Sequence, residues 1–405
     1  MHVEPDEFAR DTWSRAPLLS TSAQLGSSYD DLFSLAAVDE LLSRRGLRTP
    51  FIRLAKDGAV VPTGRYTRSG GTGAQVADQV SDDRVLALFL DGHTIVLQAL
   101  HRLWPPLIDF AGALTTDLGH PVQINAYITP SSSQGFSAHY DVHDVFVLQV
   151  AGEKRWRIHE PVHADPLRDQ PWTDHRVAVA ARAEEEPAID TVLRPGDALY
   201  LPRGYLHAAE ALGDVSCHLT VGVHPVTRHA VLESLLDLVS DDIALRASLP
   251  LGVDIADPAS VAPDVEATVA ALVERLRTVT AADVADRLGA RLVGSSRPAP
   301  VAPLAQAAAL QSLSLDSVLV ARSHQPHVLR IEGEQLLLRL SDRTLTMPVS
   351  TTKAVRALLE GETLRVGDLP DLDADVALAL ARRLVGESIA VVAVVDVVAA
   401  VDDGP

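Results

Sequence analysis

The spacing of apolar residues changes along the chain and divides it into four stretches. Residues 1–120 mix helix-like and strand-like spacings, so we expect an α/β region there. Residues 121–225 hold short apolar runs separated by Gly, Pro and Ser clusters, which is typical of antiparallel strands. Residues 226–292 return to three- and four-residue spacing and predict helices. A Pro- and Ser-rich segment at 295–303 is expected to link them to a last stretch, 300–405.

Individual elements follow from the same pattern. Helices are expected over residues 6–14, 36–45, 101–118, 230–239, 243–247, 263–278, 281–288, 353–359 and 374–384. Strands are expected over 122–128, 145–150, 155–159, 198–201, 217–223 and 389–398, and hairpins over 145–159 and 329–339. Many short strands around one site fit a jelly-roll or cupin-type barrel. The last helices with their small hairpin favour a winged-helix module.

Composition and charge narrow the class of protein. The chain has 405 residues, 47% of them hydrophobic and 22% charged, which predicts a globular protein of two or three domains. Its formal net charge of −19 argues against non-specific binding to nucleic acid and suits a basic partner. Acidic residues also outnumber basic ones after residue 361, so the winged-helix stretch is not expected to bind DNA.

The sequence also bears on location. No apolar run reaches the roughly 20 residues of a membrane helix. The first residues, 1–6, are acidic and lack the apolar core of a signal peptide. Cys217 is the single cysteine, so no internal disulfide can form. We therefore expect a cytoplasmic protein without a membrane anchor.

One group of polar residues points to metal chemistry. His139 and Asp141 are two positions apart, so on a strand both side chains would face the same side. His207 follows the apolar run at 198–201 and can reach the same place from another strand. Two imidazoles and a carboxylate suit non-haem Fe(II), because they leave coordination positions open for other ligands. With 15 histidines in the chain, a chance His-x-Asp pair is the competing explanation, and His218 is a second choice for the third ligand.

Two further residues could bind a cosubstrate. Lys154 could pair with the far carboxylate of a dicarboxylic keto acid, and Asn125 on the first expected strand offers an amide nearby. From the residues alone, an ordinary solvated lysine in a turn is the favoured interpretation of Lys154.

Two runs resemble a known family. Residues 125–159 read NAYITPSSSQGFSAHYDVHDVFVLQVAGEKRWRIH, and residues 193–223 read LRPGDALYLPRGYLHAAEALGDVSCHLTVGV. Both resemble the JmjC-type ribosomal oxygenases, a group of protein hydroxylases in the cupin superfamily, and the composition resembles that of a bacterial member. The resemblance implies an α+β protein. Its parts would be a JmjC catalytic domain with a double-stranded β-helix (jelly-roll) barrel over 1–225, a helical dimerisation region over 226–292 and a winged-helix-like domain over 300–405.

The resemblance also implies Fe(II), 2-oxoglutarate and O2 as the reactants of a dioxygenase. His139 and Asp141 in HYD, and His207 in PRGYLH, look like the iron ligands. Lys154, in GEKRW, resembles the lysine that binds the far carboxylate of 2-oxoglutarate, and Asn125 resembles an asparagine near it.

This sequence departs from the family pattern at one position. Eukaryotic members carry a serine late in the last barrel strand, where this chain has Gly222. Thr220, two positions earlier on the same face, is expected to supply the missing hydroxyl.

The resemblance further suggests a substrate. It implies a homodimer that hydroxylates an arginine or histidine of a basic protein, such as a ribosomal protein. One alternative keeps the chemistry but takes a ribosomally made peptide or a metabolite as substrate. Another is a non-catalytic cupin and winged-helix binding protein. A third, a metal-dependent cupin isomerase, would need a fuller His and Glu ligand set.

Overall fold

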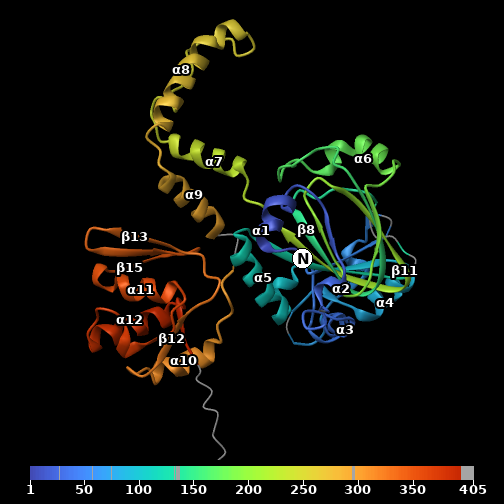
Figure 1. Ribbon diagram of the computed structural model, residues 1–405, viewed down its shortest axis with the longest axis horizontal. Helices are drawn as coiled ribbons and strands as arrows, with labels where there is room; N and C mark the ends of the chain where they lie inside the picture. Colours follow the sequence, from blue (N-terminus) through green and yellow to red (C-terminus); the bar gives the residue numbers. More distant parts are fainter. Residues whose placement is uncertain are drawn as a thin grey trace, which may run out of the picture. The chain divides into compact units, whose positions relative to one another are not determined.

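The computed structural model describes residues 1–26, 28–56, 58–73, 75–131, 133, 137–293 and 297–393, with the side chains of 292 and 293 left aside. The chain divides into two compact units, Met1–Pro225 and Val226–Pro405 (Figure 1). The expected strand at 389–398 is described only up to residue 393, and the first residues of the expected linker also lie outside the described ranges. Every helix within the described ranges is too short or too polar to cross a bilayer.

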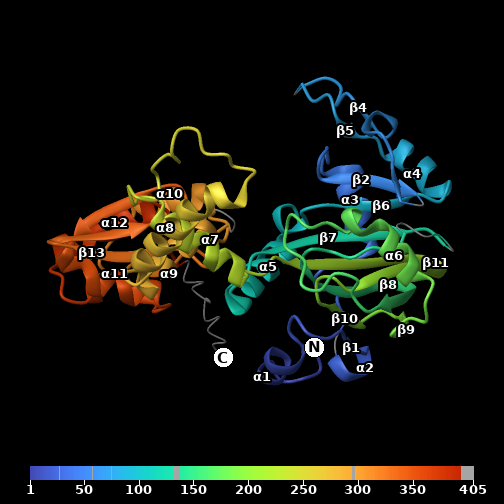
Figure 2. The same cartoon turned by 90° about the horizontal axis from the view of Figure 1, so that it is seen from above.

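The first unit is built on one antiparallel sheet that curves into the expected barrel (Figure 2). Its strands follow the order β1-β10-β8-β11-β7-β6-β2-β3, and β9 pairs with β8. The bounds are β1 (Leu18–Ser20), β2 (Ile52–Lys56), β3 (Ala59–Val60), β6 (Thr94–Leu97), β7 (Val122–Thr129), β8 (Asp144–His159), β9 (Ile189–Leu193), β10 (Ala198–Leu201) and β11 (Leu206–Val223). A separate two-stranded sheet joins β4 (Thr67–Arg68) and β5 (Gln79–Val80).

The hairpin expected over 145–159 is wrong. These residues form one long strand, β8, which pairs with β11 on both sides of the polar segment between them. Gly152 in this segment has φ of 63°, and the register with β11 shifts between Leu212 and Cys217. The segment is thus a bulge that bends the strand rather than a turn that reverses it. β11 likewise starts at Leu206 and not at the expected Cys217. The apolar pattern did not reveal its first half, because that half is more polar.

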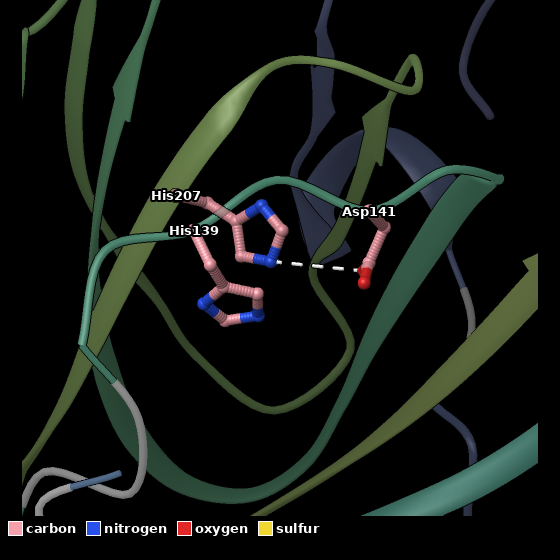
Figure 3. Close-up of side chains that lie close together, drawn as sticks. All are labelled: His139, Asp141 and His207. Carbon is pink, nitrogen blue, oxygen red and sulfur yellow. Dashed lines mark ion pairs between the residues drawn. The ribbon is translucent and has the colours of Figure 1, made fainter. Parts of the chain in front are cut away.

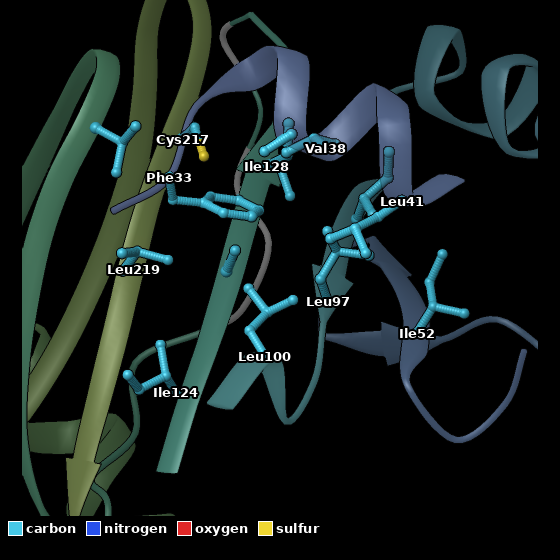
Figure 4. Close-up of a cluster of buried hydrophobic side chains, with 14 of the residues drawn as sticks. Phe33, Val38, Leu41, Ile52, Leu97, Leu100, Ile124, Ile128, Cys217 and Leu219 are labelled. Carbon is cyan, nitrogen blue, oxygen red and sulfur yellow. The ribbon is translucent and has the colours of Figure 1, made fainter. Parts of the chain in front are cut away.

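Helices flank this sheet, and Val179 of the last of them packs with Tyr140 and Leu206 apart from the largest core. The helices are α1 (Pro5–Glu7), α2 (Ser22–Leu25), α3 (Leu35–Arg44), α4 (Asp82–Leu90), α5 (Pro105–Leu118) and α6 (Arg176–Ala183). Phe33, Val38 and Leu41 from the α3 region pack with Ile128 of β7 and Leu219 of β11 in the largest apolar core (Figure 4). The chain interrupts two expected helices: residues 8–12 form a π turn, and α5 begins at Pro105 because proline suits the first position of a helix.

The second unit begins with three helices, α7 (Arg228–Val239), α8 (Pro258–Leu276) and α9 (Ala281–Val293). The helix expected over 243–247 is wrong, since these residues form turns. The rest of the unit has its own apolar core. It contains α10 (Pro303–Gln311), α11 (Thr352–Leu359), α12 (Ala374–Gly386) and two three-stranded sheets of β12 (Val318–Ala321), β16 (Leu364–Arg365), β17 (Ala390–Val392) and of β13 (Val328–Glu332), β14 (Gln335–Arg339), β15 (Thr344–Pro348).

Candidate metal centre

His139, Asp141 and His207 come together at one end of the barrel (Figure 3). Their candidate ligand atoms all lie within 4.8 Å of one another, and this is the only such group among the described residues. His139 and His207 face each other across a short bridge, in which each backbone N–H donates to the other residue's carbonyl at 3.2 and 2.8 Å. Nε2 of His207 lies 3.8 Å from Oδ2 of Asp141. The three residues expected from sequence are therefore neighbours in space.

Hydrogen bonds orient both imidazoles toward a shared point. Nδ1 of His139 lies 2.7 Å from the carbonyl oxygen of Ser137, and Nδ1 of His207 lies 3.2 Å from that of Tyr205. A carbonyl oxygen can only accept, so each Nδ1 carries the proton. Each Nε2 then keeps a lone pair for a metal ion, which is the usual arrangement of ligating histidines.

The charges of the group favour a cation. Burial and the neighbouring His139 lower the pKa of His207 to about 4, so its ring is neutral at physiological pH. Burial raises the pKa of Asp141, but the nearby His143, His207, His139 and Arg53 outweigh it and leave that pKa below its ordinary value. A carboxylate and two imidazole nitrogens are the donor set that Fe(II) accepts with positions left open.

A buried carboxylate next to the centre holds its segments in place. Asp144 is fully buried, and it accepts hydrogen bonds from the Tyr200 hydroxyl and the Arg203 backbone N–H, both at 2.9 Å. The Gly204 N–H also donates to the Asp141 carbonyl at 3.0 Å. These bonds tie the turn before His207 to the segment that carries Asp141. Sequence reasoning missed Asp144, because its partners are 56 and 59 positions away.

His139, Asp141 and His207, the candidate metal-ligand group, open into a cavity of about 260 Å³. Lys154 lines this cavity and is 4% exposed, so the interpretation of a solvated turn lysine is wrong. Its Nζ donates to Thr129 Oγ1 at 3.0 Å, and within the described ranges no carboxylate pairs with it. Burial lowers the pKa of Lys154 to about 8. A buried ammonium with only a hydroxyl partner fits a ligand that brings a carboxylate.

The other expected residues lie on the same inner face. Thr220 lines the cavity and stands opposite Asn125 in the register of β11 and β7. Asn125 is not among the residues that line the cavity, and its Oδ1 accepts the Ala99 N–H at 3.0 Å. Thr129, four positions after Asn125 on β7, was missed, although a strand places residues at this spacing on one face.

His218 is close to the cavity but outside the metal-ligand group. Its ring stacks on Tyr127, with centroids 5.1 Å apart. Burial, Lys154 and His207 together lower the pKa of His218 well below its ordinary value. The structure thus gives no support to His218 as the third ligand.

Comparison with known proteins gives this site a family. Residues 111–231 match the JmjC domain. The chain is 30% identical to ribosomal oxygenase 1 of Rattus norvegicus over 255 residues, which are 61% of this chain and 41% of that protein. It is 41% identical over 138 residues to the bifunctional lysine-specific demethylase and histidyl-hydroxylase NO66 of Drosophila erecta, covering 32% of this chain and 20% of that protein. The chain thus carries a JmjC domain and is similar to ribosomal oxygenases.

Solved structures show the same fold. Escherichia coli ribosomal oxygenase YcfD aligns with a TM-score of 0.56 at 18% identity, over 96% of this chain and 98% of that one. A structure of YcfD with cobalt and 2-oxoglutarate aligns over the same shares with a TM-score of 0.54 at 18% identity. This likeness identifies a JmjC cupin fold. The chain spans less than half the length of the animal relatives named above.

Proposed function

We propose that this JmjC protein is an Fe(II)- and 2-oxoglutarate-dependent dioxygenase that hydroxylates an arginine or histidine side chain of a ribosomal protein. One observation carries the proposal: a His-Asp-His group opens into the same cavity as a buried ammonium that has no anionic partner among the residues that the structure describes. The proteins that this chain resembles include one named as a histidyl-hydroxylase and one solved with cobalt and 2-oxoglutarate, which supports the proposal.

His139, Asp141 and His207 would hold the iron through two Nε2 atoms and a carboxylate oxygen. Iron with its keto acid and O2 supplies the oxidation: one oxygen atom enters a C–H bond, and 2-oxoglutarate becomes succinate and CO2. The chain's own residues position the reactants. They hold both imidazoles in one tautomer and keep the ligating carboxylate ionised.

Lys154 would anchor the far carboxylate of 2-oxoglutarate, and Thr129 orients its ammonium. Thr220 faces the cavity between this anchor and the open end, so we assign it a polar contact with the cosubstrate. Asn125 is assigned a supporting role beside Thr220, because the Ala99 N–H already occupies its oxygen. The apolar side chains of Val145, Val147 and Leu201 line the wall and exclude water from the reaction.

The proposed partners follow from charge and surface. A net charge of −19 suits a basic ribosomal protein in the cytoplasm. We retain 226–292 as a dimerisation region, because α7 and α8 expose large apolar residues: Leu232, Leu236, Val265, Val269 and Val273. Residues 300–405 are retained as the winged-helix-like domain.

Intact-mass spectrometry of ribosomal proteins, from native host cells with and without this gene, tests the proposal. We expect one ribosomal protein to lose the mass of one oxygen atom in the deletion strain. Complementation with the wild-type gene should restore that mass, and complementation with His139→Ala should not. Identical masses in both strains would contradict a ribosomal substrate and direct the search to peptides or metabolites.

A further inference from the structure

The inner face of the barrel is organised in three rows across β7, β11 and β8. Directly opposite residues of paired strands share a face. The first row is Tyr127, His218 and Gln149; the second is Asn125, Thr220 and Val147; the third is Gln123, Gly222 and Val145. His218, Thr220 and Val145 all line the cavity, so Gln123 also projects toward the inside of the barrel.

The third row has a gap at its centre, which another side chain fills. Gly222 has no side chain, and a Cβ there would lie 3.0 Å from Cε1 of His143 and 3.2 Å from Cγ of Gln123. The His143 ring therefore packs directly over the strand at this point. His224 meets it edge-on, with ring centroids 5.0 Å apart. Any larger residue at position 222 would displace both His143 and Gln123.

The hydrogen bonds of His143 determine how the Gln123 amide is turned. Nδ1 of His143 lies 3.3 Å from the Asp144 carbonyl oxygen, so this nitrogen carries a proton. The other ring nitrogen, Nε2, lies 3.3 Å from Nε2 of Gln123, so the amide nitrogen and not Oε1 faces the ring. The amide must donate through its nitrogen, which directs Oε1 elsewhere. Within the described ranges, no residue donates to Oε1 of Gln123, so it remains available to accept a hydrogen bond.

This acceptor is far from the proposed cosubstrate anchor. Lys154 bonds to Thr129, which is six residues beyond Gln123 on the same strand. At about 3.3 Å per residue, these two positions are about 20 Å apart. A five-carbon keto acid is much shorter than this distance. A ligand of Gln123 must therefore come from the side of the site away from Lys154, next to the segment that carries Asp141.

We propose that Gln123, held by His143 over Gly222, is a substrate-positioning residue whose Oε1 accepts a hydrogen bond from an N–H group of the target side chain. This inference rests on the proposed hydroxylase function and deepens it. An acceptor at this place favours guanidinium and imidazole groups, which donate, over aliphatic or carboxylate side chains. Gly222 is required here because it leaves room for the His143 ring.

The test uses the full-length protein with Gln123→Leu, Gln123→Glu and Gly222→Ser. Gln311→Leu, the same change at an exposed position of α10, is the matched control. Each variant is returned to the deletion strain, and the hydroxylated fraction of ribosomal protein is measured by intact mass at limiting expression. Binding of 2-oxoglutarate to each purified, Co(II)-loaded protein is measured by calorimetry without substrate.

We expect Gln123→Leu and Gly222→Ser to lower hydroxylation about tenfold or more, as the loss of one hydrogen bond to a charged or polar group predicts. Gln123→Glu keeps an acceptor oxygen but has no N–H to donate to Nε2 of His143, so it should recover only part of the hydroxylation. The affinity for 2-oxoglutarate should not change in Gln123→Leu. Normal hydroxylation by Gln123→Leu, or a weakened affinity of this variant for 2-oxoglutarate, would overturn the inference about Gln123 and leave the proposed function intact. A third outcome is that the wild type modifies no ribosomal protein while Lys154→Met still weakens 2-oxoglutarate binding. That result would contradict both the ribosomal substrate and the inference about Gln123, and it would still support the cosubstrate site.

Discussion

Replacing Lys154 with methionine should affect the stability of the protein and its affinity for 2-oxoglutarate in opposite directions. Lys154 is 4% exposed and has a hydroxyl but no carboxylate as partner among the described residues. Its pKa of about 8 lies about 2.5 below the ordinary value of 10.5. At about 1.4 kcal/mol for each pKa unit, keeping this ammonium charged costs about 3 kcal/mol. Methionine retains a similar unbranched shape without the charge.

The variant should therefore change stability and binding in opposite directions. Without ligand at pH 7, we expect Lys154→Met to raise the free energy of unfolding by up to about 3 kcal/mol, less the lost bond to Thr129. With 2-oxoglutarate, the far carboxylate would be buried without a partner, at a cost of about 3–5 kcal/mol. This corresponds to a loss of affinity of roughly two to three orders of magnitude.

The pH dependence gives a second signature. Because the folded pKa of Lys154 is depressed, the unfolded chain holds more protons than the folded one between about pH 8 and the ordinary value of 10.5. The stability of the wild type should therefore rise relative to Lys154→Met as the pH passes through this window. Below about pH 8, the difference between the two proteins should be constant.

Urea unfolding across this pH range and calorimetric titration of 2-oxoglutarate into Co(II)-loaded protein measure both effects. Lys353→Met on α11, where the lysine side chain is 71% exposed, is the control and should alter neither. Equal affinity of the wild type and Lys154→Met for 2-oxoglutarate would refute the assignment of Lys154 as the anchor. Destabilisation at pH 7 would refute the argument that its charge is uncompensated.

Three further substitutions test the metal centre and the strand that builds it. His139→Ala should abolish iron binding, seen as loss of iron by elemental analysis at unchanged unfolding midpoint; retained iron would contradict the ligand assignment. Asp144→Asn should lower the free energy of unfolding in urea by about 2–4 kcal/mol and weaken Co(II) binding, because it removes a fully buried charge that accepts from the Tyr200 hydroxyl, the Arg203 N–H and the Ser14 hydroxyl; a change in neither would show that Asp144 does not hold the centre. Gly152→Ala should cost about 1–3 kcal/mol more than Gly213→Ala in urea, since both glycines have positive φ but only the first would press a Cβ against the Val215 carbonyl; equal costs would contradict a tight bulge.

The sequence predicted the His-Asp-His group that the structure brings together because its signal is local. His139 and Asp141 are two positions apart, and His207 follows a strand whose apolar residues mark it clearly. Asp144 and Thr129 carry no such signal, because their roles depend on partners at least 25 residues away. The helix expected over 243–247 failed for a related reason: its apolar spacing is correct, but Ile243 is 78% exposed and has no surface to pack against.

Lys154 shows most clearly what local alternation cannot predict. On β8, Val145 and Val147 face the cavity, and so do Lys154 and Trp156. In a regular strand, odd and even positions face opposite sides, so these two pairs could not share one face. The irregular segment between Gln149 and Lys154 changes this alternation, because β8 has one residue more than β11 between the pairs Gln149–His218 and Ala151–Cys217. Without it, the ammonium of Lys154 would point out of the barrel.

The same bulge sets the distance between the proposed metal site and the proposed anchor of 2-oxoglutarate. Asp141 precedes the start of β8 and Lys154 lies past its bulge, so one continuous stretch of the chain carries both a candidate metal ligand and the proposed anchor. The bend at Gly152 brings Lys154 to Thr129 on β7, and β11 follows the bend with its own shift in register. The distance between metal and anchor is thus fixed by backbone pairing rather than by loops. A rigid scaffold of this kind selects a cosubstrate by its length, because both ends of the keto acid must be satisfied at once.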